Sequence, residues 1–344
     1  RTCVNLSIPI EFPMTATTAT LPPEPLDRLA WIGRVWPWLF LLALITFFEA
    51  WSQARIGRTF IFNGYNLQAI LLAASAPLML AIGQTFVIIT AGIDLSVGFV
   101  MGLAAVILAQ ATLAAGDSNA ALAIGVGVTF LVCLIPGWIN GVLIARLGVP
   151  AFIGTLGMYG VARGAGFLSA GSGMTVSIDH EGLAWLGDGW TPIIVTVVFL
   201  LGAHIVLSFT RFGQYTYAIG GNPQSALRAG INVKRHLTII YILSALFAAV
   251  GGILYTARYS AGAANAGESM LLDSIAAVVI GGASLFGGTG KVIGTLIGAL
   301  IIAVIQFGLI FLDVNAFWQF IAVGVVIIVS VLIDQYKEKL ASGK

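Results

Sequence analysis

The stretch ITAGIDLSVGFVMG, residues Ile89 to Gly102, places one carboxylate, Asp94, in the middle of a long apolar run. An aspartate at the centre of a membrane helix costs about 2.5–3.5 kcal/mol on insertion scales, so it should face a cavity or a partner inside a bundle. Gly92, two residues earlier, predicts a break at which Asp94 caps a half-helix beginning near Leu95. The stretch therefore indicates a membrane-embedded bundle with at least one broken helix.

Two compatible roles follow for Asp94. The carboxylate can cap the broken helix, or it can belong to a transport pathway or gate. Gly92, Ser96 and Gly98 lie in the same segment and carry the same two interpretations. Asp273 joins them because the Asp-Ser pair at that position loosely resembles this segment. Other polar side chains inside apolar runs are candidates for solute contact or for hydrogen bonds between helices; they are Gln84, Thr90, Asn140 and Gln306.

The composition of the chain places it in a membrane. Its 344 residues are 59% hydrophobic and 9% charged, whereas about 25% of the residues of a soluble globular protein are charged. Apolar runs recur from Trp36 to Ile333 without the period-two alternation of barrel strands. We therefore predict an all-α fold, a polytopic bundle of transmembrane helices. The net charge of +2 is too small to indicate a nucleic-acid partner.

Apolar runs long enough to cross a bilayer predict roughly ten spans, with eight spans plus re-entrant segments as the alternative. A boundary near Gly83 separates the second predicted span from the third, which contains Asp94. We expect a transmembrane domain over residues 36–334 between cytoplasmic tails at 1–35 and 335–344, with Met14 as the natural start. The predicted spans are Trp36–Trp51, Leu67–Ile82, Gln84–Ala114, Ala120–Ala145, Pro150–Ala170, Thr191–Phe209, Leu237–Ala257, Met270–Leu285, Val292–Phe311 and Ala316–Ile333.

The distribution of basic residues orients these spans. An even number of spans puts both termini on one side, and the positive-inside rule then favours the cytoplasm. The predicted outer loop, residues 171–189, holds Asp179, Glu181 and Asp188 and no Lys or Arg. Twelve of the sixteen basic residues fall inside: Arg1, Arg28, Arg34, Arg146, Arg211, Arg228, Lys234, Arg235, Lys291, Lys337, Lys339 and Lys344.

The longest polar break on the predicted inner side is TRFGQYTYAIGGNPQSALRAGINVKRH, residues Thr210 to His236. Asn222 is a favourable N-cap, Pro223 suits the first helical position, and Gly230 suits a left-handed stop, so a helix of about two turns is predicted. So short a helix is marginal in water and needs a surface to pack on. The alternative is an ordinary basic inner loop.

The stretch GGASLFGGTGKVIG, residues Gly281 to Gly294, superficially resembles a phosphate-binding loop. A P-loop requires Gly five residues before its G-K pair and Ser or Thr directly after it. With Gly290-Lys291 as that pair, Leu285 and Val292 occupy the two positions. The stretch is therefore predicted to be a turn between two membrane helices.

Three motifs in one order resemble the permease subunits of bacterial monosaccharide ATP-binding-cassette (ABC) importers, and most of all the ribose permease family. They are AGIDLSVG at Ala91–Gly98, GGNPQSALRAGI at Gly220–Ile231, and LDSIAAVVIGGASLFGGTGKVIGTLIGAL at Leu272–Leu300. The resemblance covers about Leu67 to Ile333. It implies a multi-pass subunit of the bacterial inner membrane that transports a ribose-like pentose or a hexose.

The resemblance also implies partners. A cytoplasmic ATPase would bind ATP and magnesium, a periplasmic protein would deliver the sugar, and a second permease subunit, identical or homologous, would complete the pathway. This chain would hold no cofactor and would not be an enzyme. The segment that matches the family's coupling element comprises Gly221, Asn222, Pro223, Ala226, Arg228, Ala229 and Gly230.

An ion-coupled secondary transporter for a small polar solute is the competing hypothesis, since it would also be a glycine-rich bundle with a broken helix beside a buried aspartate. The source of energy separates the two. A membrane enzyme is disfavoured, because the sequence offers no convergent His, Asp and Glu set, nucleophile elbow or metal-ligand spacing.

Overall fold

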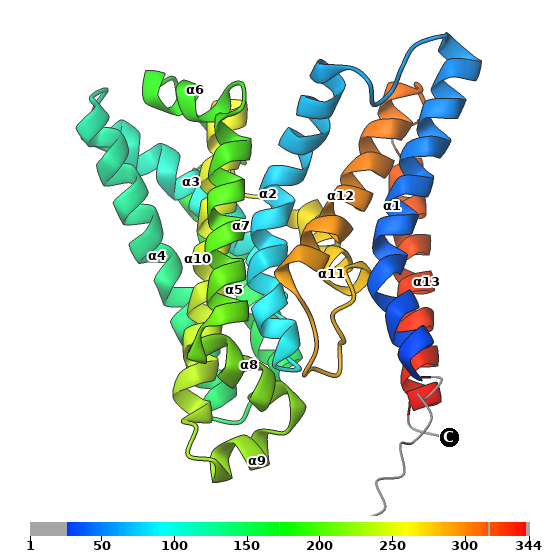
Figure 1. The fold of residues 1–344 in the computed structure, drawn as a ribbon. Coiled ribbons are helices and arrows are strands. Elements are labelled where there is room, and N and C mark those ends of the chain that lie inside the picture. Colours follow the sequence, from blue (N-terminus) through cyan, green and yellow to red (C-terminus); the bar gives the residue numbers. More distant parts are fainter. Residues whose placement is uncertain (1–25, 172, 316, 342–344) are drawn as a thin grey trace, which may run out of the picture.

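The computed structural model describes residues 26–171, 173–315 and 317–341. They contain thirteen helices and one short two-stranded ribbon (Figure 1). The all-α prediction is confirmed. Met14 and most of the predicted N-terminal tail lie outside the described residues. The helices are α1 (Leu26–Ile56), α2 (Gly64–Ile89), α3 (Val97–Ala115), α4 (Asn119–Ala145), α5 (Ala151–Ala170), α6 (Glu181–Gly187), α7 (Thr191–Phe209), α8 (Arg211–Gly221), α9 (Pro223–Arg228), α10 (Val233–Tyr259), α11 (Glu268–Ile280), α12 (Val292–Phe311) and α13 (Trp318–Ala341).

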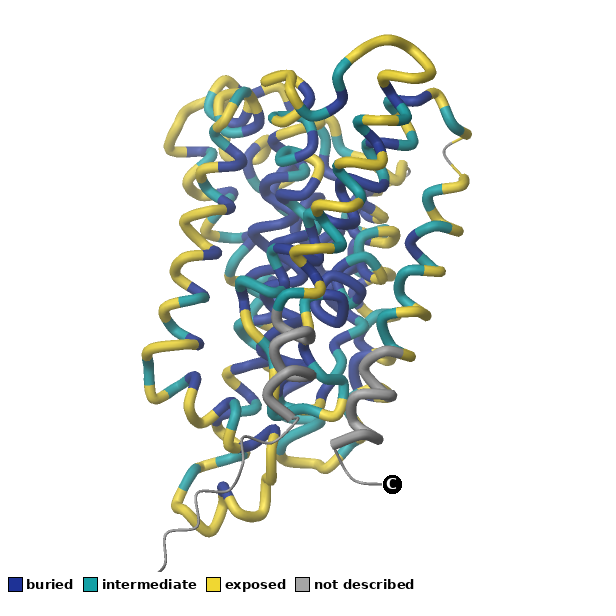
Figure 2. The backbone as a smooth tube through the Cα atoms, turned by 45° about the vertical axis from the view of Figure 1, so that its right-hand side comes forward, coloured by how far each residue is buried: buried dark blue, intermediate teal, exposed yellow. Residues whose placement is uncertain are grey.

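Helices α2, α3 and α10 form the centre of the bundle, where most of their residues are buried. Their sequences are apolar on every side, which permits burial on every side. Figure 2 shows the buried positions gathered in this centre, with exposed positions on the surrounding helices. Those outer helices expose large apolar side chains such as Leu168, which is 84% exposed. Such a surface suits contact with lipid rather than with water.

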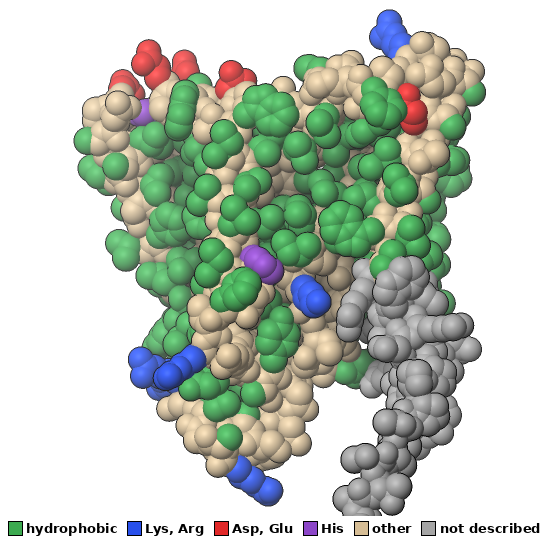
Figure 3. Space-filling view, in the orientation of Figure 1, with side chains coloured by type: hydrophobic (Ala, Val, Ile, Leu, Met, Phe, Trp, Pro, Cys, Tyr) green, Lys and Arg blue, Asp and Glu red, His purple; other side chains and the backbone are tan. Residues whose placement is uncertain are grey.

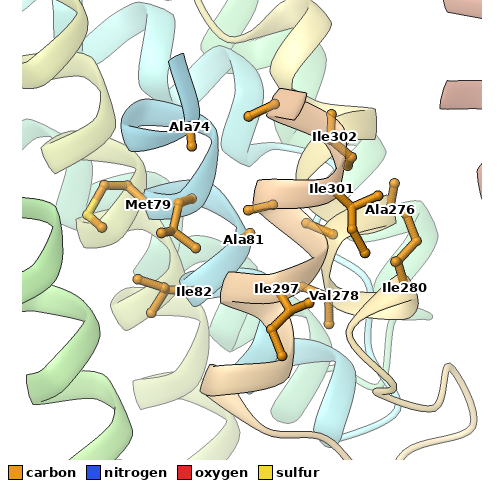
Figure 4. Close-up of a cluster of buried hydrophobic side chains, with 14 of the residues drawn as sticks. Ala74, Met79, Ala81, Ile82, Ala276, Val278, Ile280, Ile297, Ile301 and Ile302 are labelled. Carbon is orange, nitrogen blue, oxygen red and sulfur yellow. The ribbon is translucent and has the colours of Figure 1, made fainter. Parts of the chain in front are cut away.

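The largest core lies between α2 and the α11–α12 pair (Figure 4). Small side chains on α2, such as Ala74 and Ala81, let the helices approach closely, and isoleucines of α12 such as Ile297 and Ile301 fill the remaining space. Helix α11 is too short to cross a bilayer by itself, and this packing holds it against α2 and α12.

Seven helices are long and apolar enough to cross a membrane within the described part of the chain. Helices α5, α11 and α13 occupy the other three predicted spans, and α11 has only 13 residues. The predicted boundary near Gly83 is wrong, because α2 continues unbroken to Ile89. A Cβ on Gly83 would lie 3.0 Å from the Ser244 backbone, so this glycine permits close packing of α2 on α10 and does not end a helix.

The two ends of the bundle differ in charge (Figure 3). Acidic side chains gather at the end that carries α6, where the chain holds Glu181 and Asp188, and most basic side chains lie towards the end that carries α8 and α9. We call these the acidic end and the basic end. Helix α1 begins and helix α13 ends at the basic end (Figure 1). The charge asymmetry therefore follows the orientation predicted from the sequence.

Near the acidic end, strand β1 (Thr175–Ser177) pairs antiparallel with β2 (Ala261–Ala263). Val176 lies opposite Gly262, and a side chain on Gly262 would overlap the Ala105 carbonyl of α3. The ribbon thus fixes the loop that leads from α10 into α11. The sequence did not predict it, because each strand is only three residues long.

Candidate functional site

The break predicted around Asp94 occupies residues 90–96, between α2 and α3. Ala91 adopts a left-handed backbone conformation with φ of 60°, and a Cβ on Gly92 would lie 2.6 Å from the Tyr241 hydroxyl. After this reversal the chain runs back along α2: the Gln84 amide donates to the Asp94 carbonyl, and the Asp94 N–H donates to Gln84 Oε1 at 3.3 Å. One glutamine side chain therefore holds the broken segment against α2.

The Asp94 carboxylate is buried, with 1% of the residue exposed, and three donors from this chain surround it. Oδ1 accepts from the Ser96 N–H at 3.0 Å and from its hydroxyl at 2.6 Å. Oδ2 accepts from the Ser244 hydroxyl of α10 at 3.0 Å. Asn140 of α4 donates to the Ser96 hydroxyl at 2.9 Å. We call Asp94, Ser96, Asn140 and Ser244 the Asp94 cluster.

Asp94 is not the N-cap that the sequence predicts, because the N-cap of α3 is Ser96 and no side chain of the described residues accepts a hydrogen bond from the first turn of the helix. Helix α3 begins at Val97, two residues later than predicted, and Asp94 binds the N–H of its N-cap residue, Ser96. Gly98 packs one turn further on, where its Cβ would lie 2.6 Å from the Gly267 carbonyl just before α11. The cluster thus fixes how α3 enters the bundle.

Asp273 lies elsewhere, within α11. Its Oδ2 accepts from Gln306 Nε2 of α12 at 2.9 Å. Ser274 donates instead to the Leu271 carbonyl at 2.7 Å, so this Asp-Ser pair does not repeat the geometry at Asp94. The structure therefore separates Asp273 from the other predicted pathway residues.

The short helix predicted in the inner loop is present as α9. Asn222 is its N-cap and accepts from the Ser225 N–H at 2.9 Å, Pro223 is its first residue, and Gly230 follows its end with φ of 85°. Helix α9 lies at the tip of the basic end, beyond the membrane helices (Figure 1). The local sequence signals therefore predicted this element correctly.

Most of this segment is free to contact a partner. Ala226 is 3% exposed and packs inward, whereas the other predicted coupling residues are exposed: Gly221, Asn222, Pro223, Arg228, Ala229 and Gly230. Leu227 of α9 is 58% exposed, although it was not among the predicted coupling residues. An apolar residue between polar neighbours was the available signal, but the sequence alone did not indicate that its side chain faces outward.

The stretch that superficially resembled a P-loop is the connection from α11 to α12, residues Gly281–Lys291, which we call the glycine loop. The Tyr217 hydroxyl of α8 donates to the Gly290 carbonyl at 2.7 Å, and burial raises the pKa of this tyrosine, so it remains a neutral donor. The Gly288 N–H donates to the Ile89 carbonyl at the end of α2 at 2.8 Å. The loop therefore joins α8 to the start of the break.

Gly220 completes this junction. A side chain there would overlap the Ile89 carbonyl and lie 2.6 Å from the Gly288 nitrogen. Helices α9 and α8, the glycine loop and the end of α2 thus form one contiguous path from the exposed tip to the Asp94 cluster.

Comparison with known proteins adds independent information. The family model described as branched-chain amino acid transport system / permease component matches residues 66–331. The ribose import permease protein of Escherichia coli K12 is 36% identical over 332 residues, covering 94% of this chain and 100% of the relative. The fructose import permease protein of Rhizobium meliloti is 37% identical over 294 residues, covering 82% and 81%. The galactose/methyl galactoside import permease protein of Escherichia coli K12 is 37% identical over 320 residues, covering 87% and 92%. No solved structure matches.

Proposed function

Because the chain belongs to the family of transport-system permease components, we propose that it is the membrane subunit of an ABC importer that carries a monosaccharide across the bacterial inner membrane. The resemblance inferred from the three sequence motifs is confirmed. The observation that carries the proposal is that relatives named as ribose, fructose and galactose import permeases each match more than four fifths of this chain. The substrate class is therefore a pentose or a hexose.

Transport by this chain requires no covalent chemistry. We assign the binding of ATP and magnesium to a separate ATPase, which would act on this subunit through contact alone. Helix α9 is the docking element best suited to that contact, because it projects from the basic end and exposes Leu227 and Arg228. A six-residue helix is marginal in water by itself, so a groove on the ATPase would stabilise it and would follow its position.

The contacts along α8 explain how such a movement could reach the transport pathway. A shift of α9 would move α8, and α8 is tied through Tyr217 and Gly220 to the glycine loop and to the end of α2. Those elements border the break held by the Asp94 cluster. ATP binding in the partner would thereby favour one of two arrangements of the bundle, which is the requirement for alternating access.

The proposal includes an orientation. The basic end and both termini face the cytoplasm, consistent with the positive-inside rule. The acidic end, with α6 and the ribbon of β1 and β2, faces the periplasm and meets the sugar-binding protein. A second permease subunit, identical or homologous, lies across the pathway.

Reconstitution tests this function directly. The chain is placed in proteoliposomes with its cognate ATPase inside and its sugar-binding protein outside, and uptake of labelled D-ribose, D-fructose and D-galactose is measured. We expect uptake of at least one sugar that requires ATP and both partners and that survives a protonophore. Uptake that needs no ATPase and collapses with the protonophore would instead establish the ion-coupled secondary transporter.

A further inference from the structure

Near the acidic end, a cavity of about 160 Å³ opens between α2, α10 and α11. Its walls combine small residues of α2, among them Ala69 and Ala73, with three large side chains of the last turns of α10: Tyr255, Arg258 and Tyr259. The two tyrosine rings lie with centroids 4.6 Å apart at an angle of 48°. The cavity therefore presents a broad aromatic surface next to a cationic group.

The polar groups of these three side chains have no side-chain hydrogen-bond or salt-bridge partner in the part of the chain that the structure describes. Tyr259 is 62% exposed and Tyr255 is partly buried. Two hydroxyls and a guanidinium with five N–H donors are thus available to a molecule in the cavity.

A second, smaller cavity lies next to the first, nearer the middle of the bundle. Ala73 lines both, and the inner cavity is bordered by the hydrogen-bonded pair of Asp273 and Gln306. Its volume is about 10 Å³, close to the minimum that can hold one water molecule. The inner cavity is therefore too small to hold a sugar in this conformation.

We propose that the outer cavity is a binding station for a monosaccharide on its way across the membrane, and that Asp273 and Gln306 receive the sugar hydroxyls when the inner cavity widens. The inference rests on the proposed function. A sugar ring has C–H groups that pack on aromatic faces and hydroxyl groups that both donate and accept hydrogen bonds. The outer cavity supplies Tyr255 and Tyr259 for packing and Arg258 as a donor, and the inner cavity supplies Asp273 as an acceptor and Gln306 as both.

The outer cavity offers the moderate binding that transport requires. A ligand must bind well enough to enter and weakly enough to leave. The outer cavity offers one charged donor group, the Arg258 guanidinium, beside two neutral tyrosine hydroxyls. Release inward would follow from exchange of these contacts for those of the partly buried Asp273–Gln306 pair.

Cysteine labelling tests for sugar in the cavity. Met270 lines its wall, and Met270→Cys in a Cys3→Ser chain would react with a small maleimide in proteoliposomes. We expect the transported sugar, at millimolar concentration, to slow this reaction several-fold, while sorbitol does not. The same sugar should leave labelling of Ile310→Cys unchanged, since Ile310 lies outside this cavity and is 58% exposed. Equal labelling of Met270→Cys with and without sugar, in a preparation that transports the sugar, would overturn the proposal.

Substitutions separate a binding role from a structural one. Arg258→Gln and Tyr255→Ala should each lower the maximal uptake rate about tenfold, the effect of losing one charged hydrogen bond or one packed ring. Tyr255→Phe should retain most uptake, because the ring remains. Arg55→Gln and Tyr65→Ala, exposed near the outer ends of α1 and α2, serve as matched controls and should transport like the unmodified chain.

The result also distinguishes this inference from the proposed function. If the unmodified chain takes up no sugar with its ATPase and binding protein, the proposed function fails. If it takes up sugar but Tyr255→Ala and Arg258→Gln match the controls, only the binding station fails. In that case the tyrosines and the arginine anchor the helix end at the membrane surface.

Discussion

The Ser244 hydroxyl on α10 donates a hydrogen bond of 3.0 Å to Oδ2 of Asp94, across 150 residues of sequence. This bond joins the break after α2 to the longest central helix. Because the accepting carboxylate is buried, the bond has no water to replace it. The contact therefore ties α10 to the segment that precedes α3.

Ser244→Ala tests the Asp94 cluster. Loss of the donor leaves one buried carboxylate oxygen without its partner, so we expect the protein in detergent to be destabilised by about 1–3 kcal/mol. Thermal unfolding followed by fluorescence measures the change. Ser208→Ala is the control, since the Ser208 hydroxyl bonds His204 on an exposed face of α7. Equal unfolding temperatures for the two variants would contradict the structural importance of the cluster.

Asp94→Asn tests the charge itself. The asparagine side chain has nearly the shape of the aspartate side chain. One of the two carboxylate oxygens that now accept from the Ser96 and Ser244 hydroxyls would, however, be replaced by an NH₂ group, which cannot accept a hydrogen bond. We expect lower stability and an uptake rate reduced by about tenfold or more. Full uptake by folded Asp94→Asn would show that the negative charge is dispensable.

Leu227→Asp tests docking at α9. Leu227 is 58% exposed, so the change should leave the fold intact, while a charge in an apolar groove of the ATPase should weaken the complex by about 2 kcal/mol, roughly 30-fold. Co-purification with the ATPase and sugar-stimulated ATP hydrolysis are the two measurements. Leu147→Asp, on the loop between α4 and α5 and 68% exposed, is the matched control. Unchanged hydrolysis in Leu227→Asp would place the docking surface elsewhere.

Gly220→Ala tests the junction between α8, the glycine loop and α2. The added methyl group would overlap the Ile89 carbonyl, and overpacking of this kind costs about 1–3 kcal/mol. Its neighbour Gly221 has no atom within 4 Å of the position that a Cβ would take, so Gly221→Ala should unfold at the same temperature as the unmodified chain or slightly higher. If both variants unfold alike, the close approach at Gly220 is not essential.

Single cysteines test the orientation. Cys133 is buried and should resist membrane-impermeant thiol reagents, because the thiol is inaccessible and the thiolate is the reactive form. In a Cys3→Ser chain, Asp188→Cys should therefore be labelled from the periplasmic side of right-side-out vesicles. Leu227→Cys should be labelled only after the membrane is opened. The reverse pattern would invert the proposed topology.

Local signals predicted a good part of this molecule. A backbone in lipid must satisfy its hydrogen bonds internally, so the apolar composition sufficed for the all-α class. The residues flanking α9 carry their own capping chemistry, so Asn222, Pro223 and Gly230 located that helix. Three separated motifs were enough to indicate the family, which the comparisons confirm.

Other features depended on contacts between segments distant in sequence. The sequence predicted a boundary between two spans near Gly83. Gly83 instead lies inside α2, where the Ser244 backbone of α10 packs against it. Leu227 could be named from the sequence, but not as an outward-facing side chain. The sequence did not relate the Asp273–Gln306 pair to the tyrosines of α10, which line two neighbouring cavities that share Ala73 of α2.

What the sequence by itself determined is therefore the class of the fold, the family, the break at Asp94 and the short helix of the inner loop. Each depends on composition or on the chemistry of adjacent residues. Tertiary structure decided which donors meet the buried carboxylate, which face of α9 is exposed, and which side chains share a cavity. These depend on the side of each helix that meets its neighbours, and a helix that is apolar all round carries no pattern that specifies that side.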